Sequence, residues 1–247
     1  MRSAKPLTSP AVGRGEVHAK IGRDVVTDTD VAVEDHLRQS LTSAFAWPVI
    51  GEEGGRQVPD DTPYRLVDPI CGTRNFAWGI PLFAINAAMV EDSRVVVSVV
   101  GDGSTGDVLV AEAGNGTWRV REDGSNPLST SASSLIVDFG AWPTIGPERE
   151  KAAADVAEAI SSDQWDVRCF STTLSLAHVA TGQVASCVLF AAPDPVHIAA
   201  GSLLVAEAGG QVTDTAGAPW TLGARSLVCS ANEEFHAEIV RLVRSGR

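Results

Sequence analysis

Hydrophobic residues in the first half of the chain pass from helical spacing to the short apolar runs typical of strands. Val33, Leu37, Leu41 and Phe45 recur every four residues after Asp30, which predicts a first long helix with an acidic cap. Beyond it, apolar runs are separated by turn sequences such as GDGSTGD and GNG, which predict hairpins and an antiparallel sheet. The expected strands are residues 49–50, 64–67, 83–90, 95–100, 108–111 and 117–120.

Strands and helices alternate in the second half of the chain, which predicts an α/β arrangement there. The expected strands are 135–138, 167–169, 184–190, 211–213 and 227–229, and the expected helices are 147–160, 174–180, 195–208 and 233–243. Residues 1–19 contain proline and glycine without helical periodicity, which predicts a flexible N-terminal arm. We therefore expect an α+β half over 20–130 and an α/β half over 131–247, together forming one compact unit.

Composition limits the classes of partner. The 247 residues, 44% of them hydrophobic, suffice for a sizeable core, but no run approaches the roughly 18 apolar residues of a membrane span. The formal net charge of −12 repels nucleic acids and anionic membranes, and no basic cluster offsets it. Because the four cysteines form no CxxC pair and the N-terminus has no apolar signal core, we expect a cytoplasmic protein. A phosphorylated substrate would be repelled as well, so bound cations or local arginines must reverse the charge at its site.

Three acidic segments lie at the ends of successive predicted elements. They are DVVTDTD (24–30), GEEGG (51–55) and DPICGT (68–73). Hard divalent cations need several oxygen ligands, and a fold supplies them by gathering carboxylates from separate strand ends. Each segment taken alone is also typical of a polar turn or a helix cap. Their order and spacing favour a metal site.

These segments belong to a longer series of motifs that resembles the inositol monophosphatase family. The series reads TDTD, GEEGG, DPICGT, FSTTLSLAHVATG, PDPVHIAAGSLLVAEAGG and VCSAN, and the resemblance runs from about Lys20 to Val243. It implies an α/β (α+β) fold, a layered αβαβα sandwich with an antiparallel N-terminal sheet followed by a smaller α/β half. It also implies a homodimer that hydrolyses a small phosphorylated metabolite, of the inositol-phosphate, sugar-phosphate or nucleotide-phosphate type. In the family's mechanism, a metal-activated water attacks phosphorus in line without a covalent intermediate.

The resemblance implies a first metal site with oxygen ligands suited to Mg²⁺. Its ligands would be Glu52, Asp68 and the backbone carbonyl of Ile70. Thr73, with Asp30 and Glu52 nearby, would orient the attacking water. The catalytic residues carried over from the family are therefore Asp30, Glu52 and Thr73.

The second metal site of the family is altered in this chain. Cys71 stands where relatives have an aspartate, and His197 aligns with another ligand aspartate, so the set becomes Asp68, Cys71 and His197. Carboxylate, thiolate and imidazole suit Zn²⁺ or another softer transition metal better than Mg²⁺, so Zn²⁺ or Mn²⁺ in place of Mg²⁺ is the expectation for the second position. Asp194 is a reserve ligand, although Asp194 and Pro195 also form a natural helix cap. In the alternative interpretation, Cys71 is a small buried residue and the second ion is weak or absent.

The resemblance also places the substrate. The amides of Gly72 and Thr73 would bind phosphate oxygens at a helix start, and Ser171 and Thr172 fall where relatives contact the substrate. Ser171 is equally typical of a helix N-cap. Leu189 stands near an acidic position that binds substrate hydroxyls in relatives, which argues against inositol itself as the substrate.

Two other functions compete with metal-dependent hydrolysis. A cysteine phosphatase needs an arginine six residues after its nucleophile, and Ala77 occupies that position relative to Cys71. Covalent catalysis is therefore not expected. A catalytically silent relative, which binds a phosphorylated ligand or a partner, would account for Cys71, His197 and the missing acidic position.

Overall fold

The computed structural model describes residues 8, 11–20, 25–44, 46–54, 62–121, 124–131, 133–140, 147–191 and 194–245. Parts of four sequence predictions lie outside these residues: most of the N-terminal arm before residue 11, the first residue of the DVVTDTD segment, the helical position Phe45, and the end of the GEEGG segment. Strand β1 (Val17–Ala19), at the end of the predicted arm, pairs antiparallel with β2 (Val25–Thr27), which follows the arm. The limits proposed for the two halves stay predictions.

A seven-stranded sheet forms most of the N-terminal half. Its strands in sheet order are β3 (Val49–Gly51), β4 (Tyr64–Cys71), β5 (Ala84–Glu91), β6 (Arg94–Asp102), β7 (Val108–Glu112), β8 (Gly116–Arg121) and β9 (Gly124–Leu128). The sheet is antiparallel as predicted, except that β3 runs parallel to β4. The sequence prediction missed β9, because GSNPL has none of the alternation that indicates a strand.

A five-stranded sheet forms the core of the C-terminal half. Its strands in sheet order are β11 (Asp166–Arg168), β10 (Ile136–Gly140), β12 (Ser186–Leu189), β14 (Leu227–Ser230) and β13 (Gln211–Thr213). The three strands β11, β10 and β12 are parallel, whereas β14 pairs antiparallel with β12 and β13. This mixed order agrees with the predicted α/β half.

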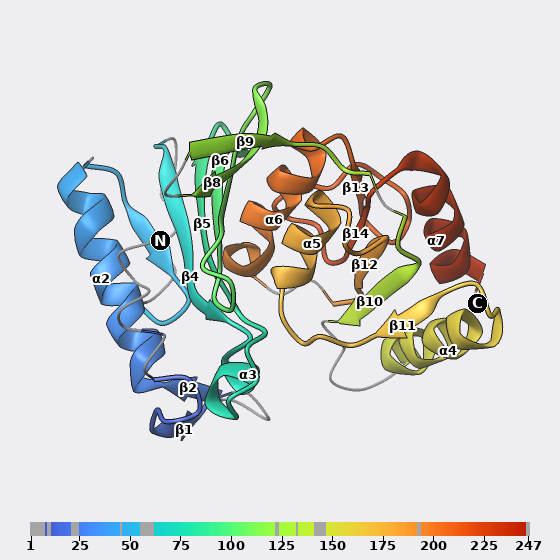
Figure 1. Ribbon diagram of the computed structural model, residues 1–247, viewed down its shortest axis with the longest axis horizontal. Helices are drawn as coiled ribbons and strands as arrows, with labels where there is room; N and C mark the ends of the chain where they lie inside the picture. The colour runs from blue at the N-terminus through green and yellow to red at the C-terminus, as the bar shows by residue number, and fades with distance from the viewer. Residues whose placement is uncertain are drawn as a thin grey trace.

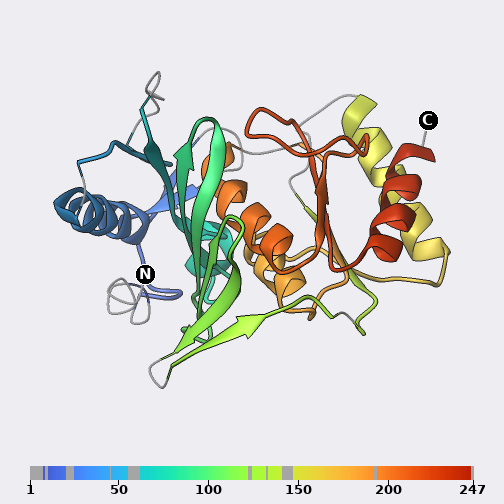
Figure 2. The ribbon, with the colours of Figure 1, turned by 90° about the horizontal axis from the view of Figure 1, so that it is seen from above.

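The helices separate and cover the two sheets. They are α2 (Asp28–Ala44), α3 (Thr73–Ala77), α4 (Pro147–Ser161), α5 (Leu174–Ala180), α6 (Pro195–Glu207) and α7 (Glu233–Ser245). Helix α2 covers the outer face of the first sheet, α5 and α6 lie between the sheets, and α4 and α7 cover the second (Figures 1 and 2). The predicted αβαβα sandwich is confirmed.

The central helix layer is apolar because it is buried on both sides. Helix α6 has apolar and small residues around most of its circumference, and Ile198, Leu204 and Val205 are each almost fully buried in the largest core cluster. Gly201 allows α5 to approach, since a Cβ there would lie 2.5 Å from a methyl carbon of Leu176. This packing fixes the start of α6, and with it His197, against the end of β4. In the described parts of the chain, no helix is both long and apolar enough to cross a bilayer.

Candidate active site

The candidate site is built around a kink at the end of β4. The pairing of β4 with β5 shifts register between Asp68 and Cys71, and Gly72 then takes a left-handed conformation with φ 104° before α3 begins at Thr73. A side chain at Gly72 would be strained and would place its Cβ 2.9 Å from the Leu82 carbonyl oxygen. The kink therefore brings side chains from the strand and from the following helix to one place.

Asp68, Cys71 and His197 meet at this kink. Their ligand atoms all lie within 4.8 Å of one another, and the His197 Nδ1 is 2.7 Å from Asp68 Oδ2. The same nitrogen is 3.9 Å from an oxygen of Glu52. The other oxygen of Asp68 is buried and has no hydrogen-bond donor among the described residues. A buried carboxylate oxygen without a donor, surrounded by other ligand types, fits a bound cation.

Asp30 and Thr73 form the second part of the site. The Thr73 hydroxyl oxygen lies 2.9 Å from Asp30 Oδ1 and 3.0 Å from the carbonyl oxygen of Ile70. The other oxygen of Asp30 accepts a hydrogen bond from the Thr27 amide at 2.9 Å. Asp30 is fully buried at the start of α2. The structure thus brings Asp30, Ile70 and Thr73 together as the sequence predicted.

Burial and mutual repulsion shift the pKa values of these groups. Burial raises the pKa of Asp30 to about 6, and burial together with the charge of Asp68 raises the pKa of Glu52 to about 7. Burial and Asp68 also raise the pKa of Cys71. Burial lowers the pKa of His197, but its contact with Asp68 outweighs this effect and leaves the value well above normal. Burial is thus the first cause of the raised pKa at Asp30, Glu52 and Cys71, and the charge of Asp68, which a cation bound beside it would offset, contributes at Glu52, Cys71 and His197.

Lys20 reaches this acidic group, which the sequence did not predict. Its ammonium nitrogen is 2.9 Å from Glu52 Oε1 and also forms an ion pair with Glu53. Burial lowers the pKa of Lys20, but the two glutamates outweigh burial and raise it. No spacing rule indicates a single lysine in a segment without periodicity.

Glu34 fixes the loop that carries Glu52. Its carboxylate accepts a hydrogen bond from the Glu53 amide at 2.8 Å and forms an ion pair with Arg38 at 2.7 Å. The Glu34 carboxylate is buried against Gly51. Any side chain at Gly51 would clash with it, since a Cβ there would lie 2.1 Å from the carboxyl carbon of Glu34. Sequence periodicity indicated only that this position belongs to α2.

The residues predicted to contact substrate have other observed contacts. The Thr172 hydroxyl donates to the Cys71 carbonyl oxygen at 2.7 Å. Ser171 is exposed and has φ 57°, and the N-cap of α5 is Thr173, so Ser171 is not the cap. Leu189 lies in the core as a strand residue of β12.

Asp194 and His197 have different roles at the start of α6. Asp194 is the N-cap and accepts a hydrogen bond from the Val196 amide at 3.1 Å, with Pro195 in the first turn. His197 follows in the same turn, and its ring joins Asp68 and Cys71. The geometry favours His197 over the reserve residue Asp194 as a ligand.

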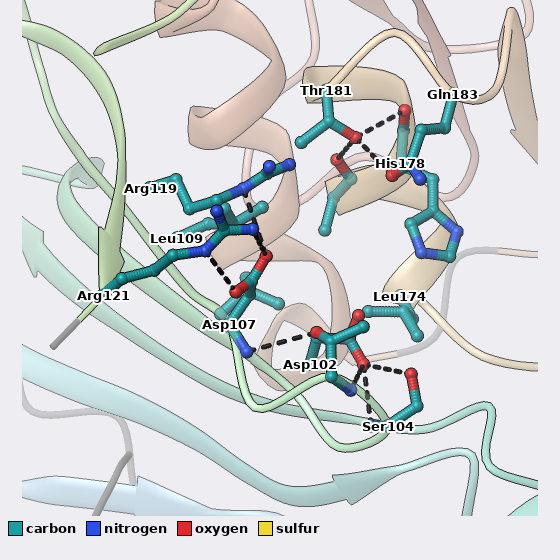
Figure 3. Close-up of a pocket in the computed structure, with 13 residues that line it drawn as sticks. Asp102, Ser104, Asp107, Leu109, Arg119, Arg121, Leu174, His178, Thr181 and Gln183 are labelled. Atoms are coloured by element: carbon teal, nitrogen blue, oxygen red, sulfur yellow. Dashed lines mark hydrogen bonds and ion pairs between the residues drawn. The ribbon is translucent and has the colours of Figure 1, made fainter. Parts of the chain in front are cut away.

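A separate cavity of about 290 Å³ lies between the sheet and α5, as Figure 3 shows. The Asp107 carboxylate in this cavity is paired with Arg121 at 2.9 and 3.0 Å and with Arg119 at 3.2 Å. The hydrogen bonds from Arg121 hold the pKa of Asp107 below its usual range. Asp102 accepts hydrogen bonds from the backbone and hydroxyl of Ser104 and caps its own turn. The acidic groups of this cavity are thus already satisfied by protein donors.

Comparisons with known proteins agree on one family. The family model described as "Inositol monophosphatase family" matches residues 7–247. Over 238 residues the chain is 33% identical to the inositol-1-monophosphatase ImpA of Mycolicibacterium smegmatis, covering 92% of this chain and 82% of that protein. Over 235 residues it is 30% identical to a fructose-1,6-bisphosphatase/inositol-1-monophosphatase of Thermotoga maritima, and the match covers 92% of this chain and 86% of that protein. A solved IMPase from Thermotoga maritima matches with a TM-score of 0.86 at 26% identity, covering 100% of this chain and 94% of that one.

Proposed function

Because the chain belongs to the inositol monophosphatase family and is a metal-dependent phosphoric monoester hydrolase, we propose that the cluster around Asp68 is its active site. One observation carries this proposal: the buried Asp68 carboxylate, with an oxygen that has no donor among the described residues, is surrounded by Glu52, Cys71 and His197. His197 contacts one oxygen of Asp68, so the second, donorless oxygen is the one available to a cation.

The metal ligands follow from the donor set. Glu52, Asp68 and the carbonyl of Ile70 offer only oxygen atoms, which suits Mg²⁺. Asp68, Cys71 and His197 offer oxygen, sulfur and nitrogen, which suits Mn²⁺ or Zn²⁺ at a second position. When bound, these ions supply positive charge for the phosphate and lower the pKa of a bound water.

The chain's own residues orient the nucleophile and the phosphate. With Asp30 accepting the hydroxyl proton of Thr73, the lone pairs of the Thr73 oxygen can accept a hydrogen bond from an attacking water. The buried carboxylate of Asp30, with its raised pKa, is suited to hold the proton that the water releases through Thr73. The amides of Gly72 and Thr73, at the start of α3, would donate hydrogen bonds to the phosphate oxygens.

The substrate is a small phosphate monoester of the inositol-phosphate, sugar-phosphate or nucleotide-phosphate type. The names of similar proteins support the first two, since one is an inositol-1-monophosphatase and another a fructose-1,6-bisphosphatase/inositol-1-monophosphatase. Leu189 is buried and apolar near the position where the family resemblance predicts a hydroxyl-binding acid, which argues against inositol phosphate itself. Of the two residues carried over from the family, Ser171 is exposed and would contact the substrate, whereas Thr172 is buried and its hydroxyl is bonded to the Cys71 carbonyl oxygen.

Two finer parts of the proposal rest on the sequence alone. The resemblance to the family supports a homodimer, and the unpaired cysteines and acidic composition support a cytoplasmic location. Sedimentation of the purified protein checks the first part, and a single species with the mass of one chain would contradict it.

A substrate panel tests the proposed function. Metal-free protein is assayed with inositol 1-phosphate, fructose 1,6-bisphosphate and a nucleoside monophosphate, each with Mg²⁺, Mn²⁺ or Zn²⁺. We expect phosphate release that depends on added metal and is lost on chelation. Absence of turnover with every pair, from folded protein that binds the metals, would contradict the proposal and support the silent alternative.

A further inference from the structure

The sulfur of Cys71 receives hydrogen bonds that a buried thiol does not require. The Thr173 hydroxyl lies 2.8 Å from the sulfur and the Thr173 amide 3.3 Å from it. A free buried cysteine behaves as a small apolar residue and is a weak acceptor. Both groups are buried, so water does not compete for these contacts. Two donors directed at one sulfur are the geometry expected around a metal-bound cysteine.

The direction of this hydrogen bond is fixed by Asn86. The Asn86 amide nitrogen lies 3.0 Å from the Thr173 hydroxyl oxygen and 3.2 Å from the carbonyl oxygen of His197. A carbonyl oxygen only accepts, so the contact with His197 fixes which end of the Asn86 amide carries the hydrogens. The Thr173 hydroxyl oxygen accepts a hydrogen bond from the Asn86 amide, and the hydroxyl proton of Thr173 is directed to the Cys71 sulfur. The result is a one-way donor chain from Asn86 through Thr173 to Cys71.

Thr173 gives up its usual local role to make this contact. It is the N-cap residue of α5, where a threonine hydroxyl ordinarily accepts from an amide of the first helical turn. No such side-chain capping bond is formed here, because the hydroxyl faces the sulfur. The Thr172 hydroxyl accepts from the Leu174 amide at 3.1 Å in its place, so the helix start does not need the Thr173 hydroxyl.

We infer that Asn86 and Thr173 are positioning residues that hold the Cys71 sulfur as a metal ligand beside Asp68 and His197, and that this position selects thiophilic divalent cations of the Zn²⁺ class over Mg²⁺. The three ligand atoms already lie within 4.8 Å of one another. Donors to a metal-bound sulfur stabilise the charge that remains on it and fix its orientation. The inference deepens the proposed function and rests on it for the location of the metal.

Binding of Co²⁺ and Zn²⁺ to metal-free protein tests this inference without any measurement of turnover. Co²⁺ bound to a cysteine sulfur gives a near-ultraviolet charge-transfer band, and a chromophoric chelator in competition reports Zn²⁺ affinity. We expect the band in the wild type and its loss in Cys71→Ser. Thr173→Val removes the hydroxyl but keeps the shape, and Zn²⁺ affinity should fall about 10- to 100-fold. Thr173→Ser restores the hydroxyl and should restore most of the affinity.

Two outcomes would overturn the inference. One is a wild type with no charge-transfer band at saturating Co²⁺, and the other is Thr173→Val protein that binds Zn²⁺ as tightly as the wild type. If Thr173→Val does not fold, Asn86→Ala replaces it, because that variant removes the donor that directs the Thr173 hydroxyl to the sulfur. Thr173→Ser stays the control that retains the hydroxyl. The same measurements separate this inference from the proposed function. A protein that shows the charge-transfer band but no phosphatase activity would contradict the proposed hydrolysis. An active enzyme that shows no charge-transfer band would contradict only the sulfur ligand.

Discussion

Asp68 and Asp107 are two carboxylates attached to the same half of the molecule, and their surroundings are opposite. The Asp107 carboxylate forms ion pairs with Arg119 and Arg121 at the edge of the cavity in Figure 3, and Arg121 lowers the pKa of Asp107. Asp68 is fully buried, and no lysine or arginine among the described residues pairs with it. Its neighbours are instead other metal-ligating groups, Glu52, Cys71 and His197.

The difference separates a structural carboxylate from a functional one. Two guanidinium groups neutralise Asp107 and leave it little capacity for a further cation. A carboxylate buried with other acids is destabilised unless a cation arrives, and the protein carries a net charge of −12 that repels phosphate. We therefore expect substitution of Asp68 to lower activity far more than substitution of Asp107.

Asp68→Asn should give the largest effect. The substitution keeps the shape of the side chain but removes the charge that both metal positions share, so kcat should fall about a thousandfold. Phosphate release with Mg²⁺ measures the effect, and thermal unfolding of the metal-free protein checks that the variant folds. Because the substitution removes the carboxylate that pairs with the His197 ring at 2.7 Å, the metal-free variant should be somewhat less stable than the wild type but remain folded. If the Asp68→Asn enzyme kept a large part of the wild-type activity, the distinction between the two carboxylates would disappear.

Glu34→Ala should give the next largest effect, although the residue is not itself a proposed metal ligand. Loss of the acceptor for the Glu53 amide frees the loop that carries Glu52, so kcat/KM should fall about 10- to 100-fold and more Mg²⁺ should be needed. Glu34→Gln retains an acceptor oxygen and should lose less. Glu207→Ala is the matched control, because Glu207 accepts from the amides of Gly114 and Gly116 far from the site. Equal losses in the Glu34→Ala and Glu207→Ala variants would mean that Glu34 acts only through general stability.

The sequence predicted the layered fold because its signals were local. The four-residue spacing in α2 and the turn sequences between β5, β6, β7 and β8 each specify one element without reference to another. The motif around Asp68 was equally visible, since strand, glycine and threonine are contiguous in DPICGT. These are the parts of the molecule where neighbours in sequence are also neighbours in space.

Residues that act across large sequence separations were missed. Lys20 meets Glu52 through a contact between residues 32 apart, and Thr173 meets Cys71 across 102. Thr173 was overlooked although its neighbours Ser171 and Thr172 were named, because only the helix start of α5 turns its hydroxyl toward the kink. No periodicity or spacing rule encodes such a contact, since tertiary packing alone creates it.

Cys71→Asp tests whether the sulfur ligand sets the metal preference of the Asp68 site. Aspartate supplies the oxygen ligand that Mg²⁺ prefers, so the ratio of activity with Mg²⁺ to activity with Zn²⁺ should rise about tenfold. Initial rates over a series of each metal measure this ratio. Cys71→Ser is the control, because it supplies oxygen without charge and should not raise the activity with Mg²⁺. Loss of activity with every metal in the Cys71→Asp variant would instead assign the sulfur a role that an oxygen ligand cannot replace.

Asp107→Asn should give the smallest effect on activity. The carboxylate faces Arg119 and Arg121 and is remote from the kink, so kcat/KM should stay within about twofold of the wild type while the free energy of unfolding falls by about 0.5–1 kcal/mol. Denaturant unfolding across a pH series measures the loss. Arg121 lowers the folded-state pKa of Asp107, so the stabilisation is present above the usual aspartate pKa of about 4 and disappears as the pH falls through the lower folded value.

The difference in stability between wild type and Asp107→Asn should therefore shrink toward zero in acid, whereas it should stay constant from about pH 5 to 8. High salt should shrink it as well, because Arg121 is half exposed and screening weakens exposed ion pairs. A variant of unchanged stability that loses most of its activity would show that the cavity in Figure 3 takes part in catalysis. In that case the two carboxylates would both be functional, and ion pairing by arginine would not distinguish a structural acid from a metal ligand in this fold.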